Sequence, residues 1–305
     1  MQGIKYYLKE PRAIGRSLLR RFSGLLSDRL YVKYMYYLQT GKRLNLEHPQ
    51  SFSEKLQWLK LYNRRPEYTT MVDKYAVKEY VANIIGQEYI IPTIGVWDSP
   101  DQIDWDNLPR RFVLKTTQGG GNKGVIICTD KEKFDKEAAL RKLKSALQID
   151  LSRQLAEWPY KNVRRRIIAE KYLSDGCEAE DSSMPHDLVD YKILCFDGKP
   201  LYCMVVSNRR TNKSYDFFDN DWNHMPFRLS HFPNAKKMPS KPLHYETMRV
   251  LAAKIAEGHP HLRVDFYEVG GKVYFGEITF FTLSGYNTFL PEEWDIKIGS
   301  YIKLH

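Results

Sequence analysis

Two carboxylates near the end of the chain carry the clearest chemical signal in the sequence. Asp265 and Glu277 stand in runs otherwise rich in Val, Phe, Tyr and Ile, which predict two antiparallel strands joined by a turn containing Gly270 and Gly271. An ionised carboxylate in an apolar strand is costly unless a positive charge accompanies it. Arg263 could supply that charge, and so could Mg²⁺, which takes its ligands from carboxylates, phosphates and water. The pair therefore indicates a site for a nucleoside triphosphate.

The spacing of the two carboxylates sets a condition on this hairpin. They are twelve positions apart, so a two-residue turn at Gly270 and Gly271 would place them on opposite faces of the sheet. An odd-length loop, such as a three-residue loop with a left-handed glycine, or a β-bulge would bring them onto one face. A solvated edge hairpin whose charges face water is the alternative.

A glycine-rich stretch between two β-rich runs is a second candidate for phosphate binding. It covers residues 116–124, directly after Lys115, and an apolar run at 125–128 follows it. The stretch matches GxGxxG, but the dinucleotide-binding motif requires a helix at this point, and the Lys-Ser/Thr pair of a P-loop is absent. A loop between two strands can instead close over phosphates with its backbone N–H groups, with Lys115 as a charged partner. A plain flexible hairpin loop is the alternative.

Two further lysines stand where a cation calls for an anionic partner. Lys74 lies near the start of a helix predicted from Asp73 to Gly86, where the helix dipole disfavours positive charge. Lys192 lies in the apolar run 189–196, which we expect to form a hairpin with 200–206. We expect an anion beside each of them, although Lys74 taken alone could equally be a solvated surface lysine.

The elements that would position these residues alternate between helices and short strands. A capping box at Ser51 and Glu54 starts one helix, a charged helix is expected over about 131–157, and another precedes the Asp265 strand. Residues 207–240 are rich in Asn, Asp and Pro and predict a long loop with little regular structure. This mixture indicates an α+β protein.

The composition indicates a basic protein but does not identify its ligand. The net charge of +10 over 305 residues implies attraction to polyanions in general. Residues 1–43 carry ten basic and two acidic side chains with apolar residues at helical spacing, which predicts a basic amphipathic helix. We expect it to cover the body of the protein, with an anionic membrane or a partner as the alternative.

The cysteines and the hydropathy pattern concern the location of the protein. None of the four cysteines forms a CxxC pair, and three of them stand in strand-like apolar runs, as reduced thiols do. No apolar run reaches about 18 residues, and no signal-peptide pattern is present. We therefore expect a cytoplasmic protein.

Several short motifs, in their order along the chain, resemble the ATP-grasp superfamily. Four of them are similar to motifs of the TupA-like ATP-grasp family, which is associated with teichuronopeptide and other cell-surface polysaccharide loci. These are Phe52-Ser-Glu-Lys-Leu-Gln-Trp58, Asp73-Lys-Tyr-Ala-Val-Lys-Glu-Tyr-Val81, Asp190-Tyr-Lys-Ile193 and Gly276-Glu-Ile-Thr-Phe280. The resemblance runs from about residue 50 to the end of the chain.

The resemblance implies an α+β ATP-grasp fold in which two lobes enclose ATP. The implied parts are an N-terminal basic helical region at 1–70, a part with the glycine loop at 71–173, and a lobe with the metal-binding hairpin at 174–305. The implied ATP contacts are phosphate contacts from Lys74, Lys115 and Lys192, a closing loop at Gly119, Gly120 and Gly121, and an adenine hinge at Glu170, Lys171 and Leu173.

The same resemblance implies roles for the hairpin. Asp265 and Glu277 would hold Mg²⁺, and Arg263 would stabilise the transferred phosphoryl group, with Lys192 acting from the neighbouring strand. Many ATP-grasp ligases have Asn two residues after the metal-binding Glu, whereas this chain has Thr279, whose hydroxyl is a weaker Mg²⁺ ligand. The usual ribose-binding acid has three candidates in one polar segment, Glu178, Glu180 and Asp181.

The activity implied is that of an ATP- and Mg²⁺-dependent carboxylate–amine ligase that acts through an acyl phosphate on a sugar or uronic acid in capsule or surface-polysaccharide synthesis. A phosphotransferase on a sugar hydroxyl is one alternative. A nucleotide-sugar glycosyltransferase that uses Asp219 and Asp221, a DxD pattern, is another. We expect a small-molecule or glycan substrate and no nucleic acid. The basic N-terminus could contact an anionic membrane or the polysaccharide machinery, which leaves a membrane-associated scaffold as the non-enzymatic alternative.

Overall fold

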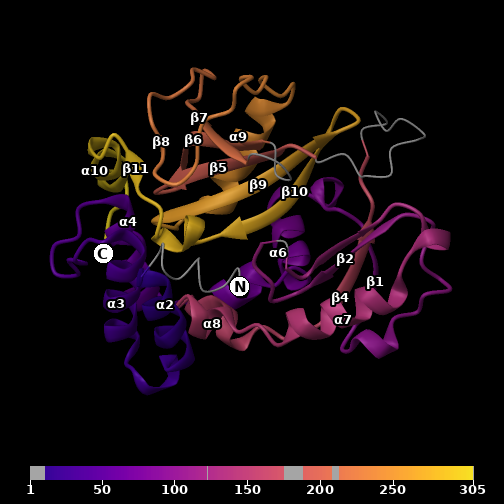
Figure 1. Ribbon diagram of the computed structural model, residues 1–305. Helices are drawn as coiled ribbons and strands as arrows, with labels where there is room; N and C mark the ends of the chain where they lie inside the picture. Colours follow the sequence, from indigo (N-terminus) through magenta and orange to yellow (C-terminus); the bar gives the residue numbers. More distant parts are fainter. Residues whose placement is uncertain (1–10, 122, 175–187, 208–212, 305) are drawn as a thin grey trace.

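The computed structural model describes residues 11–121, 123–174, 188–207 and 213–304, and Figure 1 shows two antiparallel sheets with helix α6 between them. The larger sheet has the strand order β10-β9-β5-β6-β7. Its strands are β5 (Asp190–Phe196), β6 (Lys199–Ser207), β7 (Ser214–Phe218), β9 (His261–Val269) and β10 (Lys272–Thr279).

Helix α9 (Tyr245–Ala256) covers one face of the larger sheet. It buries Met248, Leu251 and Ile255 in the same core as Val264 and Phe266 of β9. Residues alternate between the two faces of a strand, so Arg263 and Asp265, on either side of Val264, point to the other face. The face away from α9 is therefore the one that carries Arg263 and Asp265.

The smaller sheet has the strand order β1-β4-β2-β3. Its strands are β1 (Thr93–Trp97), β2 (Phe112–Thr116), β3 (Val125–Cys128) and β4 (Ile167–Lys171). Phe112, Leu114, Ile167 and Ala169 form a separate core with Leu143 of α7 (Lys136–Leu147). The opposite face of this sheet carries Lys115 and Glu170.

The remaining helices gather beside the two sheets. Figure 1 shows α2, α3 and α4 grouped near α10. The helices are α2 (Pro11–Arg21), α3 (Asp28–Thr40), α4 (Phe52–Tyr62), α5 (Glu67–Val72), α6 (Ala76–Ile85), α8 (Leu151–Gln154) and α10 (Glu293–Ser300), and the 3₁₀ turns are η1 (Ser23–Leu25), η2 (Gln87–Tyr89), η3 (Pro100–Gln102), η4 (Lys131–Lys133), η5 (Trp158–Asn162) and η6 (Thr282–Gly285). The capping box at Ser51 and Glu54 is confirmed at the start of α4.

Three predicted elements are wrong in extent. The described part of the basic N-terminus forms two helices, because Ser27 accepts a hydrogen bond at the start of α3, so a new helix begins there. The expected helix at 131–157 is divided, because Asp135 and Asp150 cap separate helices.

The third concerns the loop expected at 207–240. It includes β7 and the short strand β8 (Arg228–Leu229), which pairs with β11 (Phe289–Leu290). The apolar side chains of β7, Tyr215, Phe217 and Phe218, are buried and place it at the sheet edge despite the Asn and Asp around it.

Cys128, Cys195 and Cys203 are buried free thiols in β3, β5 and β6, as the sequence predicted, and Cys177 lies outside the described residues. In the part of the chain that the structure describes, no helix has the length and apolar character needed to cross a bilayer. The three-part division at 70 and 173 stays a prediction.

Candidate active site

The β9–β10 hairpin brings the two predicted carboxylates opposite each other. The turn has two residues, Gly270 and Gly271, with φ of +56° and +71°, a conformation that glycine adopts without strain. The register then shifts at Gly276, so that Glu277 pairs with Asp265. The bulge, rather than an odd-length loop, satisfies the condition set by the sequence.

Neighbouring register positions place all the predicted hairpin residues on one face. Thr279 pairs with Arg263 two residues away from the carboxylate pair, and Lys192 of β5 pairs with Asp265 from the other side. Strand alternation puts these five side chains on the face away from α9. The structure therefore brings Arg263, Asp265, Glu277, Thr279 and Lys192 together.

Cations surround both carboxylates. The Arg263 guanidinium donates to both oxygens of Asp265, at 2.7 and 2.9 Å, and its Nη2 also donates to Glu277 Oε1 at 3.2 Å. Lys192 Nζ lies 3.0 Å from Asp190 Oδ2 and makes a short contact with Asp265. Lys74 Nζ reaches Glu277 Oε2 from α6's N-terminal side, at 3.3 Å. We call Lys74, Lys192, Arg263, Asp265 and Glu277 the hairpin cluster.

Electrostatics keep the carboxylate of Glu277 ionised. Burial acts to raise its pKa, but the positive charges of Lys74, Lys192 and Arg263 outweigh burial and hold the pKa of Glu277 well below its ordinary value. Burial acts to lower the pKa of Arg263, and Asp265 beside it reverses that effect and raises the pKa. Three cationic side chains therefore surround Asp265 and Glu277, and Asp190 is a third carboxylate in contact with Lys192.

Lys74 is positioned by the residues on either side of it. Asp73 accepts hydrogen bonds from the backbone N–H groups of Tyr75 and Ala76 at 2.8 and 3.2 Å, and it forms an ion pair with Arg166 at 3.0 Å. The backbone N–H of Lys74 donates to the carbonyl of Thr117 at 3.1 Å. This bond fixes the lysine to the first residues of the glycine loop.

The glycine loop joins β2 to β3, as the sequence predicted, and two of its glycines are required by close packing. A Cβ on Gly124 would lie 2.2 Å from Thr116 Oγ1, and one on Gly119 would lie 2.7 Å from the same atom. Gly121 has φ of +63° and open space around it. Gly119, Gly120 and Gly121 follow Thr117, whose carbonyl accepts from the Lys74 N–H, and residue 122 is outside the described residues.

Lys115 and Glu170 meet each other on the smaller sheet. Glu170 is buried, makes a short ion pair with Lys115, and lies 2.5 Å from Lys78 of α6. Burial acts to raise the pKa of Glu170, and the two lysines outweigh it and lower that pKa. Lys171 is exposed and Leu173 is buried just beyond β4, so the three predicted hinge residues end one strand. Glu178, Glu180 and Asp181 lie outside the described residues.

Three charged residues around this site were not singled out from the sequence. Lys78 lies in the first turn of α6, whereas Lys74 lies just before that helix, and the two lysines contact different carboxylates, Glu170 and Glu277. Arg166 precedes β4 and stacks over Tyr75 at 4.7 Å in addition to pairing with Asp73. Lys60 continues the apolar stripe of α4 that begins with Phe52, and it is fully buried.

Lys60 holds the turn that follows β10. Its Nζ donates to the carbonyls of Leu155 and Ser284 at 3.0 and 2.8 Å, and burial lowers its pKa to about 8. Ser284 donates a short hydrogen bond to Glu157, a buried carboxylate whose pKa burial raises against the opposing charge of Lys60. Leu283 and Ser284 have positive φ, so this turn is strained and is held by buried polar contacts.

Asp219 and Asp221 lie in a turn of their own after β7. Both carboxylate oxygens of Asp219 accept hydrogen bonds within the turn, from the N–H groups of Asp221 and Asn223 at 3.0 and 2.8 Å and from Asn223 Nδ2 at 3.0 Å. Asp221 is exposed. The contacts are those of a polar turn.

The donor set of the hairpin cluster fits Mg²⁺ and a polyphosphate. Asp265 and Glu277 offer hard oxygen ligands, with the Thr279 hydroxyl on the same face, and Mg²⁺ bound by two carboxylates completes its shell from phosphates and water. Among the described residues, no group of three His, Cys, Asp or Glu side chains could hold a metal by itself. Lys74, Lys192 and Arg263 are the donors that phosphate oxygens accept from.

Comparison with known proteins identifies a family whose model matches this chain. The model of the family described as TupA-like ATPgrasp matches residues 54–303. No curated protein sequence matches the chain.

Among solved structures, the D-alanine–D-alanine ligase of Helicobacter pylori is 12% identical, with coverage of 76% of this chain and 62% of the ligase and a TM-score of 0.38. The D-alanine–D-alanine ligase of Bacillus anthracis complexed with ATP is 15% identical, with coverage of 69% and 53% and a TM-score of 0.38. A RimK domain ATP-grasp protein of Sphaerobacter thermophilus is 12% identical, with coverage of 79% and 70% and a TM-score of 0.41. The chain thus spans less than two thirds of the length of the first two.

Proposed function

The chain belongs to the TupA-like ATP-grasp family, and from that premise we propose that it is an ATP- and Mg²⁺-dependent carboxylate–amine ligase that acts through an acyl phosphate. The observation that carries the proposal is the hairpin cluster. The carboxylates of Asp265 and Glu277 lie among three cationic side chains in a largely buried site, with Asp190 beside Lys192 as a further carboxylate. Such an array binds a metal–polyphosphate and neutralises charge during phosphoryl transfer.

The roles of the residues follow from their positions. Asp265 and Glu277 hold the cation with help from Thr279, and Lys74, Lys115 and Lys192 contact phosphates. Arg263 stabilises the charge of the group in transfer. When bound, ATP with Mg²⁺ supplies the phosphoryl group that makes a carboxylate reactive toward an amine.

The rest of the proposed site orients ATP and excludes water. Gly119, Gly120 and Gly121 cover the phosphates with backbone N–H groups. Their loop begins beside Thr117, whose carbonyl accepts a hydrogen bond from the backbone N–H of Lys74. Glu170, Lys171 and Leu173 contact the adenine at the end of β4. A covered site protects an acyl phosphate from hydrolysis, so the amine is its acceptor.

The substrate class and location extend the same proposal. We place the reaction in the synthesis of capsule or other surface polysaccharide, with a uronic acid or a similar sugar carboxylate as the group activated and an amino acid or amino sugar as the amine. The support is the family match, together with the basic character of the chain, which suits acidic glycans.

The N-terminal helices support a peripheral contact with the inner face of an anionic membrane. Four apolar side chains on and after α2 are exposed, namely Ile14, Leu18, Phe22 and Leu25. Beside them lies a cleft of about 480 Å³, which Arg20, Arg21 and Arg153 line. Basic side chains next to exposed apolar ones favour an anionic lipid surface, and flotation with vesicles that contain phosphatidylserine tests this.

A phosphotransferase is the second candidate, and Glu157 is the observation that favours it. This buried carboxylate lies close enough to Arg263 for the guanidinium charge to act on its pKa, and burial raises that pKa, as suits a group that takes a proton from a sugar hydroxyl. In a ligase, Glu157 instead holds the turn at Ser284.

Calorimetry with Mg²⁺ tests the site, with ATP, ADP and several UDP-sugars as ligands. We expect ATP and ADP to bind, and the double variant Asp265→Asn/Glu277→Gln to lose at least tenfold in affinity. Asp101→Asn, an exposed aspartate paired with Lys144, is the matched control and should leave the affinity unchanged. Preference for a UDP-sugar with no effect of the double variant would overturn the proposal.

Product analysis separates the two activities. A ligase releases inorganic phosphate when carboxylate and amine are both present, and hydroxylamine traps its acyl phosphate as a hydroxamate. A phosphotransferase keeps the phosphate on the sugar and releases none. Glu157→Gln would abolish the phosphotransferase and leave hydroxamate formation by a ligase detectable.

A further inference from the structure

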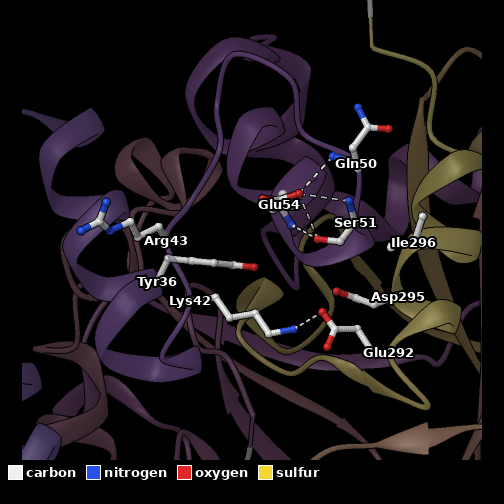
Figure 2. A pocket seen from close by; sticks show the side chains of 9 residues that line it. All are labelled: Tyr36, Lys42, Arg43, Gln50, Ser51, Glu54, Glu292, Asp295 and Ile296. Atoms are coloured by element: carbon white, nitrogen blue, oxygen red, sulfur yellow. Dashed lines mark hydrogen bonds and ion pairs between the residues drawn. The ribbon is translucent and has the colours of Figure 1, made fainter.

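A second site, a partly open pocket, lies away from the hairpin cluster, between α3, the start of α4 and α10. It is a cavity of about 140 Å³, and Figure 2 shows the side chains around it. Tyr36 of α3, Ser51 at the α4 N-terminus and Asp295 of α10 line it. None of its lining residues has a role in the proposed ligase reaction.

Asp295 is the unusual member of this cavity. The residue is 3% exposed, and its Oδ2 accepts a hydrogen bond from Ser53 Oγ at 2.9 Å. Its Oδ1 is buried and has no hydrogen-bond partner among the described residues. Figure 2 shows the Asp295 carboxylate directed toward the space that the Tyr36 hydroxyl and Ser51 also face. A buried carboxylate oxygen without a donor is costly, which points to a ligand that supplies one.

The other charges around the cavity are already matched. Lys42 Nζ lies 2.5 Å from Glu292 Oε1. The carboxylate of Glu54 accepts from the backbone N–H groups of Gln50 and Ser51 at 3.0 and 3.1 Å in the capping box. Arg43 extends away from the cavity in Figure 2. In the described part of the chain, the negative charge of Asp295 therefore has no cation in contact with it.

We propose that this cavity binds a small primary ammonium compound whose nitrogen donates to Asp295 Oδ1. An ammonium group supplies both the missing donor and the missing positive charge, whereas a neutral alcohol supplies only the donor. A metal ion needs more ligands than one carboxylate, and no cluster of three ligating acids, histidines or cysteines exists among the described residues.

The volume limits the size of the ligand. A cavity of about 150 Å³ accommodates benzene, so about 140 Å³ takes up to about six non-hydrogen atoms. The surrounding groups suit a polar amine, because the Tyr36 hydroxyl, which lies 3.0 Å from Ser53 Oγ, keeps an acceptor position for its other end. Burial raises the pKa of Asp295 to about 6 against smaller opposing effects of Ser53, Ser51 and Lys42, so the carboxylate is ionised near neutral pH and above. The other charged side chains around the cavity are Arg43, Glu54 and Glu292.

Ethylammonium chloride is the probe, measured at pH 8 by calorimetry and by thermal unfolding of the full chain. We expect binding at one site, and a rise in the unfolding temperature beyond that given by equal sodium chloride. Asp295→Asn keeps the shape and removes the charge, and it should weaken binding at least tenfold. Asp101→Asn is the matched control and should bind like wild type.

Two further measurements keep the test decisive if Asp295→Asn fails to fold. Ethanol at the same concentration should stabilise the wild type less than ethylammonium does. Wild-type affinity should fall about tenfold between pH 8 and pH 5, since Asp295 takes up a proton with a pKa of about 6. Equal binding to Asp295→Asn, equal stabilisation by ethanol or by sodium chloride, or affinity independent of pH would each overturn the proposal.

Discussion

The hairpin cluster and the α4–α10 cavity each bury an aspartate, but in opposite surroundings. Asp265 is 1% exposed and contacts the guanidinium of Arg263 and the ammonium of Lys192. Asp295 is 3% exposed and contacts a serine hydroxyl. The two sites therefore differ in charge partners and not in burial.

The difference appears in the pKa values of the carboxylates. Burial raises the pKa of Asp295 to about 6 because the hydrogen bonds of Ser53 and Ser51 and the charge of Lys42 oppose it only weakly. Glu277, beside Asp265, has a lowered pKa because Lys74, Lys192 and Arg263 outweigh burial. Burial sets the cost of a charge, and neighbouring cations decide whether the charge persists. A site with several cationic donors suits a polyphosphate, and a site with a lone carboxylate suits a cation.

Removal of Lys192 should make the hairpin cluster resemble the cavity. Lys192→Met keeps the length of the side chain and removes the ammonium that contacts Asp190 and Asp265. We expect the free energy of unfolding at pH 7 to fall by about 3–5 kcal/mol, the cost of breaking a buried pair. Urea denaturation measures it, and nucleotide binding should be lost as well.

The pH dependence of that loss identifies its cause. Lys192 is one of the charges that lower the pKa of Glu277, so the stabilisation it gives is present above the ordinary pKa of 4.5 and decreases as pH falls below it. The deficit of Lys192→Met should therefore shrink below pH 4.5. Lys303→Met, which removes an exposed pair with Asp197, should change stability by less than about 1 kcal/mol. A deficit no larger than this control would mean that the two regions do not differ as described.

Asp295→Asn, in contrast to Lys192→Met, should raise the free energy of unfolding at high pH. The folded pKa of about 6 lies above the ordinary value of 3.8, so the folded state holds a proton more strongly and wild-type stability falls as pH rises through this window. Asparagine has no proton to lose, so the variant should exceed wild type by about 1–3 kcal/mol at pH 8 and match it near pH 4. Urea denaturation at both pH values measures this. A variant less stable than wild type at pH 8 would show that Asp295 has a cation partner.

The features of the candidate site that could be predicted are those that depend on residues close together in the sequence. Carboxylates in apolar runs, a glycine stretch between strands and a capping box each involve neighbours in sequence, and all three have the predicted local form. The hairpin parity was also a local argument. Parity alone could not distinguish a bulge at Gly276 from a longer turn at Gly270, because either one places Asp265 and Glu277 on the same face.

Partners distant in sequence could not be predicted. Lys60 meets carbonyl oxygens 95 and 224 positions away, and Lys78 meets Glu170 from another element. A lysine on an apolar helix face indicates that a partner exists but does not say which. The extents of the N-terminal helices and of α7 were wrong for a different reason. Their hydrophobic period continues across Ser27 and Asp150, while the capping side chains end one helix and begin another.

Gly276→Ala tests whether the charge matching of the hairpin cluster depends on the bulge. A Cβ at this position would lie 3.0 Å from Tyr267 Cε2 and 3.1 Å from the backbone oxygen of Asp265. The tyrosine ring can move, but the strand backbone cannot do so without shifting Asp265. We expect a loss of about 1–2 kcal/mol in unfolding free energy, which urea denaturation measures. We also expect ATP affinity, measured by calorimetry, to fall about tenfold.

Gly271→Asn is the control, since asparagine tolerates positive φ and open space surrounds the position. It should lower the unfolding free energy by only a few tenths of a kcal/mol. Equal ATP affinity in the two variants would mean that the alignment of Asp265 with Glu277 tolerates a displaced bulge.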